Sequence, residues 1–328
     1  SPIFINMGER VSSFKRLESD ATLEPFDSQP QLNSISEEGS QNSCLGQQNQ
    51  QPHSAPDIDW GKSEVSPAQK EQLQQLAAEY SDVFVDPITK ELGLTDKAEC
   101  TIPLKEGATP VKKYPYRQAP QMREAMDEIV QDQLKRGLLE ECNSGDWASP
   151  ALLVKKGSGG LRLVIDYRGL NAATMDSVIR IPRIDELLDT IGENQPQFFS
   201  VLDLTQGFHQ IPLHKDSRDK TAFITPMGKY RYKTMPQGYK NAPAVFQSLM
   251  DNLLRGISYK YAMVYIDDLC IFSATFEQHL LHLREVFSRL RDAKLKLHPK
   301  KCALAVKKVG YLGHVLTPEG ISPNPDKV

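Results

Sequence analysis

Two adjacent acidic residues, Asp267 and Asp268, lie inside an otherwise apolar stretch that runs from Tyr261 to Phe272. A buried carboxylate without a partner costs several kcal/mol, so charges in such a place usually occupy a turn or neutralise a bound cation. A tight hairpin meets both conditions, because its strands pack into the core while its turn presents the acids. A plain surface turn is the alternative, since an Asp-Asp pair occurs by chance about once in a chain of this length.

A third acid, Asp203, directly follows the apolar run from Phe198 to Leu202. An acid at the end of a strand, on the edge of a core, is well placed to share a metal ion with acids from another strand. Three carboxylates gathered in this way would hold two Mg²⁺ ions about 4 Å apart, which activates a primer 3′-hydroxyl and stabilises the leaving pyrophosphate. The spacing along the chain does not show whether Asp203 meets the other two acids.

The elements expected to position these acids mix strands and helices without a regular βαβ rhythm, which favours an α+β fold over a doubly wound sheet. Apolar runs predict strands at 151–156, 161–165, 198–204, 210–213, 221–225 and 230–234. Hairpins are expected around Asp267 and in the last segment, ending near Val315. Periodic apolar residues predict helices at 66–80, 120–135, 184–191, 242–254 and 276–294.

The composition is that of an ordinary globular protein. The longest apolar run, Tyr261 to Tyr265, is far shorter than the ~20 residues that a membrane-spanning helix needs, and the N-terminus lacks a signal region. We therefore expect a soluble, cytoplasmic protein with no membrane partner. The cysteines are odd in number and lack CxxC spacing, so free thiols are expected rather than disulfides or a structural zinc site.

Charge and composition divide the chain into three regions. Residues 1–60 are rich in Ser, Gln, Glu, Asn and Pro, which predicts a disordered acidic and polar linker. Residues 61–100 predict a short helical segment ahead of the main domain, which is expected at 101–328. The first 100 residues carry 7 Lys and Arg against 17 Asp and Glu, and the remainder carries 32 against 25. That basic second part suits a polyanionic partner, although a solvated surface explains it equally well.

Five segments, in order along residues 100–328, resemble the reverse transcriptase family, especially gypsy-type long-terminal-repeat retrotransposons and their retroviral relatives. They are LRLVIDYRGLN (161–171), FSVLDLTQGFHQIPL (199–213), KTAFITPMGKYRYKTMPQGYKNAPAVFQSLM (220–250), YAMVYIDDLCIFS (261–273) and KKCALAVKKVGYLGHVLTPEGI (300–321). The resemblance implies an α+β right-hand polymerase with fingers at about 110–198 and 214–235 and palm at about 199–213 and 236–328. The thumb is expected to be absent, since in the family it would begin near Val328.

The resemblance also implies a catalytic role for the acids. Asp203, Asp267 and Asp268 are similar to the family's metal-binding triad, for Mg²⁺ or Mn²⁺, with Asp203 and Asp267 as bridging ligands. Phe208 resembles the aromatic gate that packs under the sugar and excludes a 2′-hydroxyl. Without the flanking motif, Phe208 would be read as a core aromatic residue.

Four further residues resemble the nucleotide site. Lys155 and Arg162 match the fingers residues that clamp the triphosphate, one as a point charge and the other as a planar fork. Read without the resemblance, they are solvated hairpin charges. Gln237 and Gly238 are similar to the segment that lines the nucleotide and template pocket, where glycine lets the backbone approach closely. Gypsy-type elements often carry Phe in place of Gln237, so this position departs towards the retroviral pattern.

The C-terminal motif resembles the primer grip, with Gly310, Tyr311, Leu312 and Gly313 holding the primer terminus. Lys300 or Lys301 matches the lysine that helps to protonate pyrophosphate, and the register between them is open. His279 and His282 stand at i and i+3 of a predicted helix. They are either a metal pair without further ligands or part of a solvated face, and the second interpretation is favoured.

The function implied by the resemblance is RNA-directed and DNA-directed DNA synthesis by two-metal nucleotidyl transfer. Its partners would be an RNA template, a DNA primer and product, and dNTPs. The chain begins with Ser rather than Met, which we expect of a fragment of a retroelement Pol polyprotein with protease, RNase H and integrase domains, working in a virus-like particle. The rival is a catalytically inactive or host-adopted nucleic-acid-binding fragment. An RNA-synthesising palm polymerase is disfavoured by Phe208.

Overall fold

The computed structural model describes residues 55–156, 159–179 and 181–325, which belong to one unit spanning 50–328. Most of the predicted linker, residues 1–54, lies outside them. Ile58, however, is 6% exposed and belongs to the main core cluster, against which Trp60 also packs. The packed region therefore begins before residue 61, the predicted boundary, because Ile58 and Trp60 pack against the core. The sequence did not indicate this, since these two apolar residues are not part of a periodic pattern.

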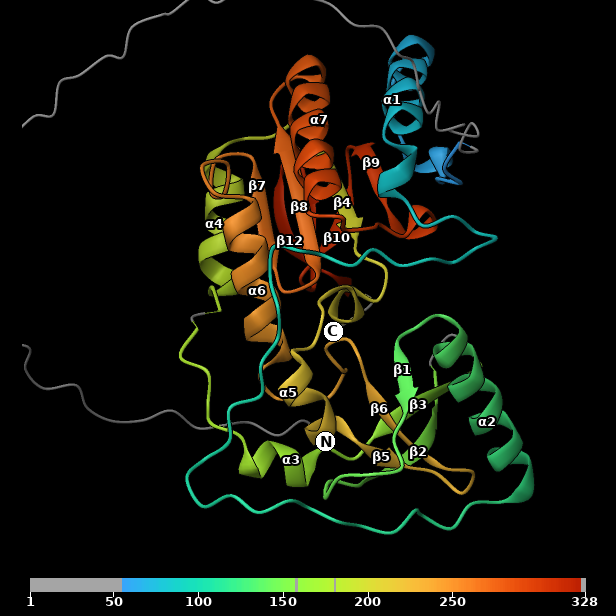
Figure 1. Cartoon of the computed structure of the whole chain (residues 1–328). Coiled ribbons are helices and arrows are strands. Elements are labelled where there is room, and N and C mark those ends of the chain that lie inside the picture. Colours follow the sequence, from blue (N-terminus) through green and yellow to red (C-terminus); the bar gives the residue numbers. More distant parts are fainter. Residues whose placement is uncertain (1–54, 157–158, 180, 326–328) are drawn as a thin grey trace, which may run out of the picture. The chain divides into compact units, whose positions relative to one another are not determined.

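A five-stranded sheet forms the first half of the domain (Figure 1). Its order is β1-β6-β5-β2-β3, and all neighbours are antiparallel except β2 and β5. Helix α2 contacts β1, β2 and β3. The bounds are β1 Leu139–Glu141, β2 Ser149–Lys155, β3 Leu161–Ile165, β5 Phe223–Ile224, β6 Lys229–Tyr232 and α2 Pro120–Lys135.

A four-stranded antiparallel sheet of order β7-β8-β4-β9 forms the second half. Its strands are β4 Phe198–Asp203, β7 Ala262–Tyr265, β8 Asp268–Ser273 and β9 Ala303–Val306. Helix α7 (Phe276–Asp292) contacts β4 and β8, and α6 (Ala242–Leu253) contacts β7. Because side chains alternate along a strand, Leu202 and Leu269 join the core under α7, whereas Phe199 and Phe272 join a second core.

That second core is closed by helix α4 (Ile184–Glu193) and by a small antiparallel sheet, β10-β11-β12. Leu187 and Ile191 of α4 and Tyr311 and Leu316 of the small sheet are buried in it. The small sheet consists of β10 Val309–Tyr311, β11 His314–Thr317 and β12 Gly320–Pro323. The four-stranded sheet is therefore covered on both faces, which fixes its strands firmly.

The segment ahead of the main domain packs on α7. Helix α1 (Pro67–Glu79) begins with a capping box, in which the side chain of Ser66 accepts from the amide of Gln69 and the side chain of Gln69 accepts from the amide of Ser66. Tyr80 and Phe84 then contact the ring of Phe287 in α7 at 5.7 and 5.6 Å between centroids. These contacts make the segment part of the same core.

Most predicted elements are confirmed, including the five helices and both hairpins. The strand predicted at 210–213 is wrong. A short 3-10 helix, Gly207–Gln210, ends there, and Pro212 and Leu213 form only isolated bridges to Thr234 and Cys100. Pro212 has no amide to donate, so a regular ladder cannot continue through it. Helices α3 (Arg168–Ala173) and α5 (Lys215–Arg218) were missed because they are too short to show periodicity.

Two composition-based predictions can also be compared with the structure. Within the described ranges, no helix is long and apolar enough to cross a membrane. The four cysteines that lie in those ranges are buried free thiols, as expected; Cys44 lies outside them.

Candidate active site

The fold brings the predicted acids to one edge of the four-stranded sheet. Asp203, the last residue of β4, pairs directly with Asp268, the first residue of β8, and Asp268 also pairs with Tyr265 of β7. Ile266 and Asp267 thus form the turn between β7 and β8, where Asp267 and Asp268 are exposed. The hairpin predicted from the Asp-Asp pair is present, and Asp203 lies against it.

The turn contains backbone strain that a buried side chain compensates. Ile266 has a φ of +57°, a conformation that costs a β-branched residue roughly 1–3 kcal/mol. Its amide donates to Oε1 of Gln247 in α6 at 2.8 Å, and Nε2 of the same buried amide donates to Asp251. Helix α6 therefore fixes the turn that presents Asp267.

A lysine compensates the charge of this edge. Like charges directly opposite each other in a sheet are destabilising, so the Asp203–Asp268 pairing favours a nearby cation. Lys301 Nζ lies 3.3 and 3.4 Å from the two carboxylate oxygens of Asp203. Lys300 instead pairs with Asp57 at 3.0 Å. Of the two lysines between which the sequence left the motif position open, Lys301 is therefore the one that lies at the acids.

The acids suit a divalent cation in chemistry. Carboxylate oxygens are the ligands that Mg²⁺ and Mn²⁺ prefer, and Asp203 already holds a positive group. In the described part of the chain, no three His, Cys, Asp or Glu side chains are gathered closely enough to hold an ion. The backbone pairing therefore places the three acids at one edge of the sheet, and the carboxylate of Asp203 contacts Lys301 there.

Phe208 lies on the 3-10 helix that follows β4. Its half-buried ring packs edge-to-face on Phe246 of α6, with centroids 5.7 Å apart. A Cβ at Gly207 would stand 2.9 Å from the same Phe246 ring, so only glycine fits beside it. The ring of Phe208 is supported by Phe246 and is partly exposed to solvent, which suits a residue that contacts the sugar of a nucleotide. Its role as the steric gate stays a prediction.

Lys155 and Arg162 lie near the tip of the β2–β3 hairpin and are exposed. Lys155 pairs with Leu161, and Arg162 pairs with Val154. Since directly paired residues share a face and successive residues alternate, the two cations point to opposite faces of the hairpin. The structure places them one register step apart but does not bring their side chains together.

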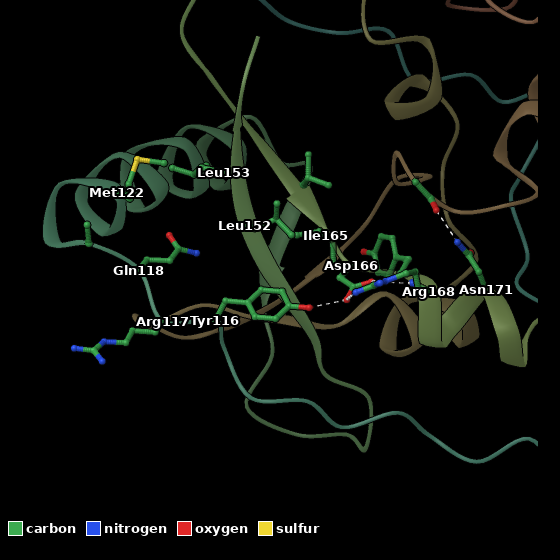
Figure 2. Close-up of a pocket in the computed structure, with 14 residues that line it drawn as sticks. Tyr116, Arg117, Gln118, Met122, Leu152, Leu153, Ile165, Asp166, Arg168 and Asn171 are labelled. Carbon is green, nitrogen blue, oxygen red and sulfur yellow. Dashed lines mark hydrogen bonds and ion pairs between the residues drawn. The ribbon is translucent and has the colours of Figure 1, made fainter. Parts of the chain in front are cut away.

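Gln237 and Gly238 are exposed beside the five-stranded sheet. Gly238 has a φ of +90°, and its carbonyl accepts from Nδ2 of Asn171 at 2.9 Å. It borders a cavity of about 660 Å³ that also contacts Tyr116, Arg168 and the β2–β3 hairpin (Figure 2). A left-handed residue at this rim explains the need for glycine.

The sequence interpretation missed an ion pair in this cavity. Arg168 donates from Nε and Nη2 to Asp166 at 2.8 and 2.9 Å, and the hydroxyl of Tyr116 donates to Asp166 at 2.8 Å (Figure 2). The hydrogen bonds from Arg168 hold the pKa of the Asp166 carboxyl well below its usual range. Asp166 is 5% exposed and Arg168 is 82% exposed, so the guanidinium is anchored yet open to a ligand. The sequence signal that could have predicted this ion pair is Asp-Tyr-Arg, which directly follows the strand that ends at Ile165.

The predicted primer grip is the β10–β11 hairpin. Leu312 and Gly313 form its two-residue turn, with φ values of +48° and +81° that match the twist of such hairpins. The buried hydroxyl of Tyr311 lies 3.4 Å from the carbonyl of Asp268. Asp268 also lines a cavity of about 220 Å³ together with Gly310, Tyr311, Leu312 and Gly313. Two motifs that are about 40 residues apart in sequence therefore meet.

The favoured interpretation of His279 is wrong. His279 is fully buried, and both of its ring nitrogens lie within hydrogen-bond distance of serine hydroxyls. The reason is helical phase: α7 buries Phe276, His279, Leu283, Val286, Phe287 and Leu290, and His279 falls on that stripe. His282 is half-buried and stacks on Tyr261 at 3.6 Å.

The four-stranded antiparallel sheet presents acids at the β7–β8 turn and Phe208 on the turn after β4, and the five-stranded sheet carries a cationic hairpin; this arrangement is that of a polymerase palm and fingers. Residues 154–316 match the family described as reverse transcriptase (RNA-dependent DNA polymerase), and this part of the chain belongs to that family. The α+β fingers-and-palm fold predicted from sequence is thereby confirmed.

Several known proteins are similar to the chain. The Pol polyprotein of transposon 297 from Drosophila melanogaster is 43% identical over 66% of this chain and 20% of its own length, and that of transposon 412 is 38% identical over 79% and 21%. The Tf2-3 polyprotein of Schizosaccharomyces pombe is 30% identical over 78% and 19%. The chain thus spans about a fifth of these relatives.

Solved structures of a foamy viral protease-reverse transcriptase are also similar. The complex with an RNA/DNA hybrid has a TM-score of 0.73 and 26% identity, covering 81% of this chain and 35% of that one. The complex with double-stranded DNA has a TM-score of 0.72 and 26% identity, covering 81% and 54%.

Proposed function

We propose that this chain is the core of an RNA-directed and DNA-directed DNA polymerase that transfers nucleotides to a primer 3′-hydroxyl. The observation that carries the proposal is the pairing of Asp203 with Asp268, with Asp267 in the adjoining turn and Lys301 against Asp203. Membership of the reverse transcriptase family supports it.

The acids would hold two Mg²⁺ ions, or Mn²⁺ in their place. When bound, such ions lower the pKa of the attacking hydroxyl and stabilise charge on the leaving pyrophosphate. Lys301 lies at the same edge and is suited to give a proton to that pyrophosphate, since an ammonium is a compact donor. Tyr311 ties the primer-grip hairpin to the carbonyl of Asp268, which would keep the primer end close to the acids.

The remaining site residues would select the substrate. Phe208, braced by Phe246, would lie under the sugar and exclude a 2′-hydroxyl. Lys155 and Arg162 would bind the triphosphate of a dNTP from the exposed hairpin. Gln237 and Gly238 would line the nucleotide and template pocket, next to the anchored guanidinium of Arg168.

The partners follow from the same proposal. The foamy viral neighbours are described in complex with an RNA/DNA hybrid and with double-stranded DNA, and we propose an RNA template, a DNA primer and dNTPs for this chain. The similar proteins are named Pol polyproteins, so we propose that the chain works beside protease, RNase H and integrase domains, in the cytoplasm and within a virus-like particle.

Primer extension tests the proposal. The wild-type chain and Asp267→Asn would be assayed on poly(rA)/oligo(dT) with dTTP and either Mg²⁺ or Mn²⁺. We expect incorporation by the wild type, and a loss of at least about 100-fold in Asp267→Asn, because an amide is a weak ligand for a hard cation. Incorporation that persists in Asp267→Asn would contradict the metal site.

The second candidate is a catalytically inactive nucleic-acid-binding fragment. The excess of Lys and Arg over Asp and Glu in residues 101–328, 32 against 25, favours it, because such a charge suits a polyanionic partner without requiring catalysis. Such a fragment would bind an RNA/DNA hybrid equally well as wild type and as Asp267→Asn, and would incorporate no dTTP with either metal. Filter binding beside the extension assay separates the two functions.

A further inference from the structure

A chain of buried polar side chains lies between α7 and the four-stranded sheet that carries the proposed acids. We term it the serine–histidine bridge and define it as Ser200, His279 and Ser273. His279 Nε2 lies 2.7 Å from Ser200 Oγ, and its Nδ1 lies 2.8 Å from Ser273 Oγ. Ser200 and His279 are 0% exposed and Ser273 is 5% exposed. The bridge connects three elements, because Ser200 is on β4, Ser273 ends β8 and His279 is on α7.

The bridge continues to a fourth element, β9. Ser200 Oγ accepts from the amide of Ala305 at 2.9 Å, and Ser273 Oγ lies 2.8 Å from Nδ1 of His282. In one arrangement each hydroxyl donates once and accepts once: the Ala305 amide donates to Ser200, Ser200 to His279 Nε2, His279 Nδ1–H to Ser273, and Ser273 to His282. This arrangement requires a neutral His279. Burial lowers the pKa of His279 to about 3, which is consistent with it.

The Ala305 contact lies at an irregularity of the sheet. Phe199 pairs with Val306 and Val201 pairs with Ala303, so the register between β4 and β9 shifts opposite Ser200. Ala305 has a φ of +49°, which is unusual for a residue other than glycine. A bulge frees a backbone amide from the ladder, and Ser200 Oγ accepts that amide. The hydroxyl of Ser200 therefore stabilises the bulge.

The bridge and the acids use the same strands from opposite faces. Ser200 precedes Asp203 by three residues, and Ser273 follows Asp268 by five. Ser200 pairs with Ile271, so Ser200 and Ser273 are diagonal neighbours on the face that α7 covers. Asp203 and Asp268 fall on the other face. A slip of one residue would exchange the two faces, so a bond that fixes Ser200 against Ser273 also fixes Asp203 against Asp268.

We infer that His279 is a positioning residue of the proposed polymerase site, which holds β4 and β8 in register through Ser200 and Ser273 and so sets the spacing of Asp203 and Asp268. The inference rests on the proposed function. Through Ser200 and the bulge at Ala305, the same bridge holds β9, which begins two residues after Lys301. His279 would touch neither substrate nor metal ion.

Three variants test this role. His279→Leu removes both ring nitrogens, whereas His279→Gln keeps one acceptor and one donor. Leu283→Val is the matched control, because Leu283 is 0% exposed, lies one turn further along the same stripe of α7 and has no polar side-chain atom that could hydrogen-bond to the bridge. Binding of Mn²⁺ by the full chain would be measured by electron paramagnetic resonance, together with hydrogen exchange of the β4 and β8 amides.

We expect His279→Leu to weaken Mn²⁺ binding by about tenfold or more, since residues that orient metal ligands typically matter to that degree. His279→Gln should remain within about threefold of wild type, and Leu283→Val should bind as wild type does. Exchange at Val201, Leu202 and Leu269 should be faster in His279→Leu than in Leu283→Val. Unchanged Mn²⁺ binding in His279→Leu would overturn the role of the bridge.

Failure of the proposed function gives a different pattern. If the wild type binds no Mn²⁺, or Asp203→Asn binds it equally well, the metal site itself is refuted. Hydrogen exchange then decides the bridge alone: faster exchange in β4 and β8 of His279→Leu than of Leu283→Val supports it, and equal exchange overturns it.

Discussion

In the proposed site, the choice between deoxyribonucleotides and ribonucleotides depends on one side chain, that of Phe208. Its ring is braced by Phe246 and partly exposed, so truncation should open space beneath the sugar while it removes the contact with Phe246. We expect Phe208→Ala to raise the incorporation of rUTP relative to dTTP by about 10- to 100-fold, the range that one steric contact usually supplies. Competitive primer extension measures the ratio. Phe208→Tyr keeps the ring and should keep the selection, and an unchanged ratio in Phe208→Ala would remove Phe208 from the gate.

Lys301 and Lys300 offer a matched pair of substitutions. Lys301 contacts Asp203, whereas its neighbour contacts Asp57. If Lys301 protonates pyrophosphate, Lys301→Ala should slow single-turnover incorporation by about 100-fold, as expected for loss of a general acid. Lys300→Ala should change the rate by less than about threefold. Equal effects of the two substitutions would mean that the contact with Asp203 has no catalytic role.

The residues of the site were predictable to different degrees. Asp267 and Asp268 stand out because charge within an apolar run needs a reason, and their hairpin is present. The pairing of Asp203 with Asp268 is a long-range contact that spacing cannot give. The choice between Lys300 and Lys301 depends on side-chain direction. The ion pair of Asp166 with Arg168 was missed because only the fold shows that Asp166 is buried.

At the scale of elements, the turn after β4 gives a stability prediction. The chain can pass Phe246 only because Gly207 has no side chain: a Cβ there would lie 2.9 Å from two ring atoms. We expect Gly207→Ala to lower the free energy of unfolding by about 1–3 kcal/mol through overpacking. Gly192→Ala is the control, since it lies in α4 with no atom nearer than 3.7 Å and should be neutral or stabilising by about 0.5–1 kcal/mol. Urea unfolding measures the stability of both variants. A neutral effect of Gly207→Ala would show that the Phe246 ring moves aside to accommodate the added Cβ.

Elements with many periodic residues were predicted well, and elements defined by distant partners were not. Helix α7 has a full apolar stripe, so its existence was clear, but the position of His279 on that stripe was misjudged because a polar residue was assumed to face water. The segment at 210–213 has strand-like composition, yet its backbone bonds are divided between two segments, 95–100 and 233–235. They come from the amides of Thr95, Cys100 and Met235 and go to the carbonyl of Lys233. The conformation of such a segment is set by its tertiary partners, which the local sequence does not reveal.

For the whole molecule, acid should loosen the fold before carboxylates begin to titrate. Burial lowers the pKa of His279 to about 3, and burial also lowers the pKa of His209 and His282. The groups that face this part of the core are His282 and Glu285 on α7, Tyr261 before β7 and Lys307 after β9. Each buried histidine must remain neutral in the folded chain, whereas in the unfolded chain it takes up a proton near its ordinary pKa of about 6.5.

The unfolded state therefore binds more protons than the folded state between about pH 6.5 and the lowered pKa, and the stability contributed by each histidine is complete above that window and lost as pH falls through it. Each contributes a slope of at most about 1.4 kcal/mol per pH unit. We expect urea unfolding to show falling stability from pH 7 to 5, and His279→Gln to reduce that slope by about 1 kcal/mol per unit. If His279→Gln keeps the wild-type slope, His279 already carries its proton in the folded chain, and the directional arrangement of the serine–histidine bridge cannot hold.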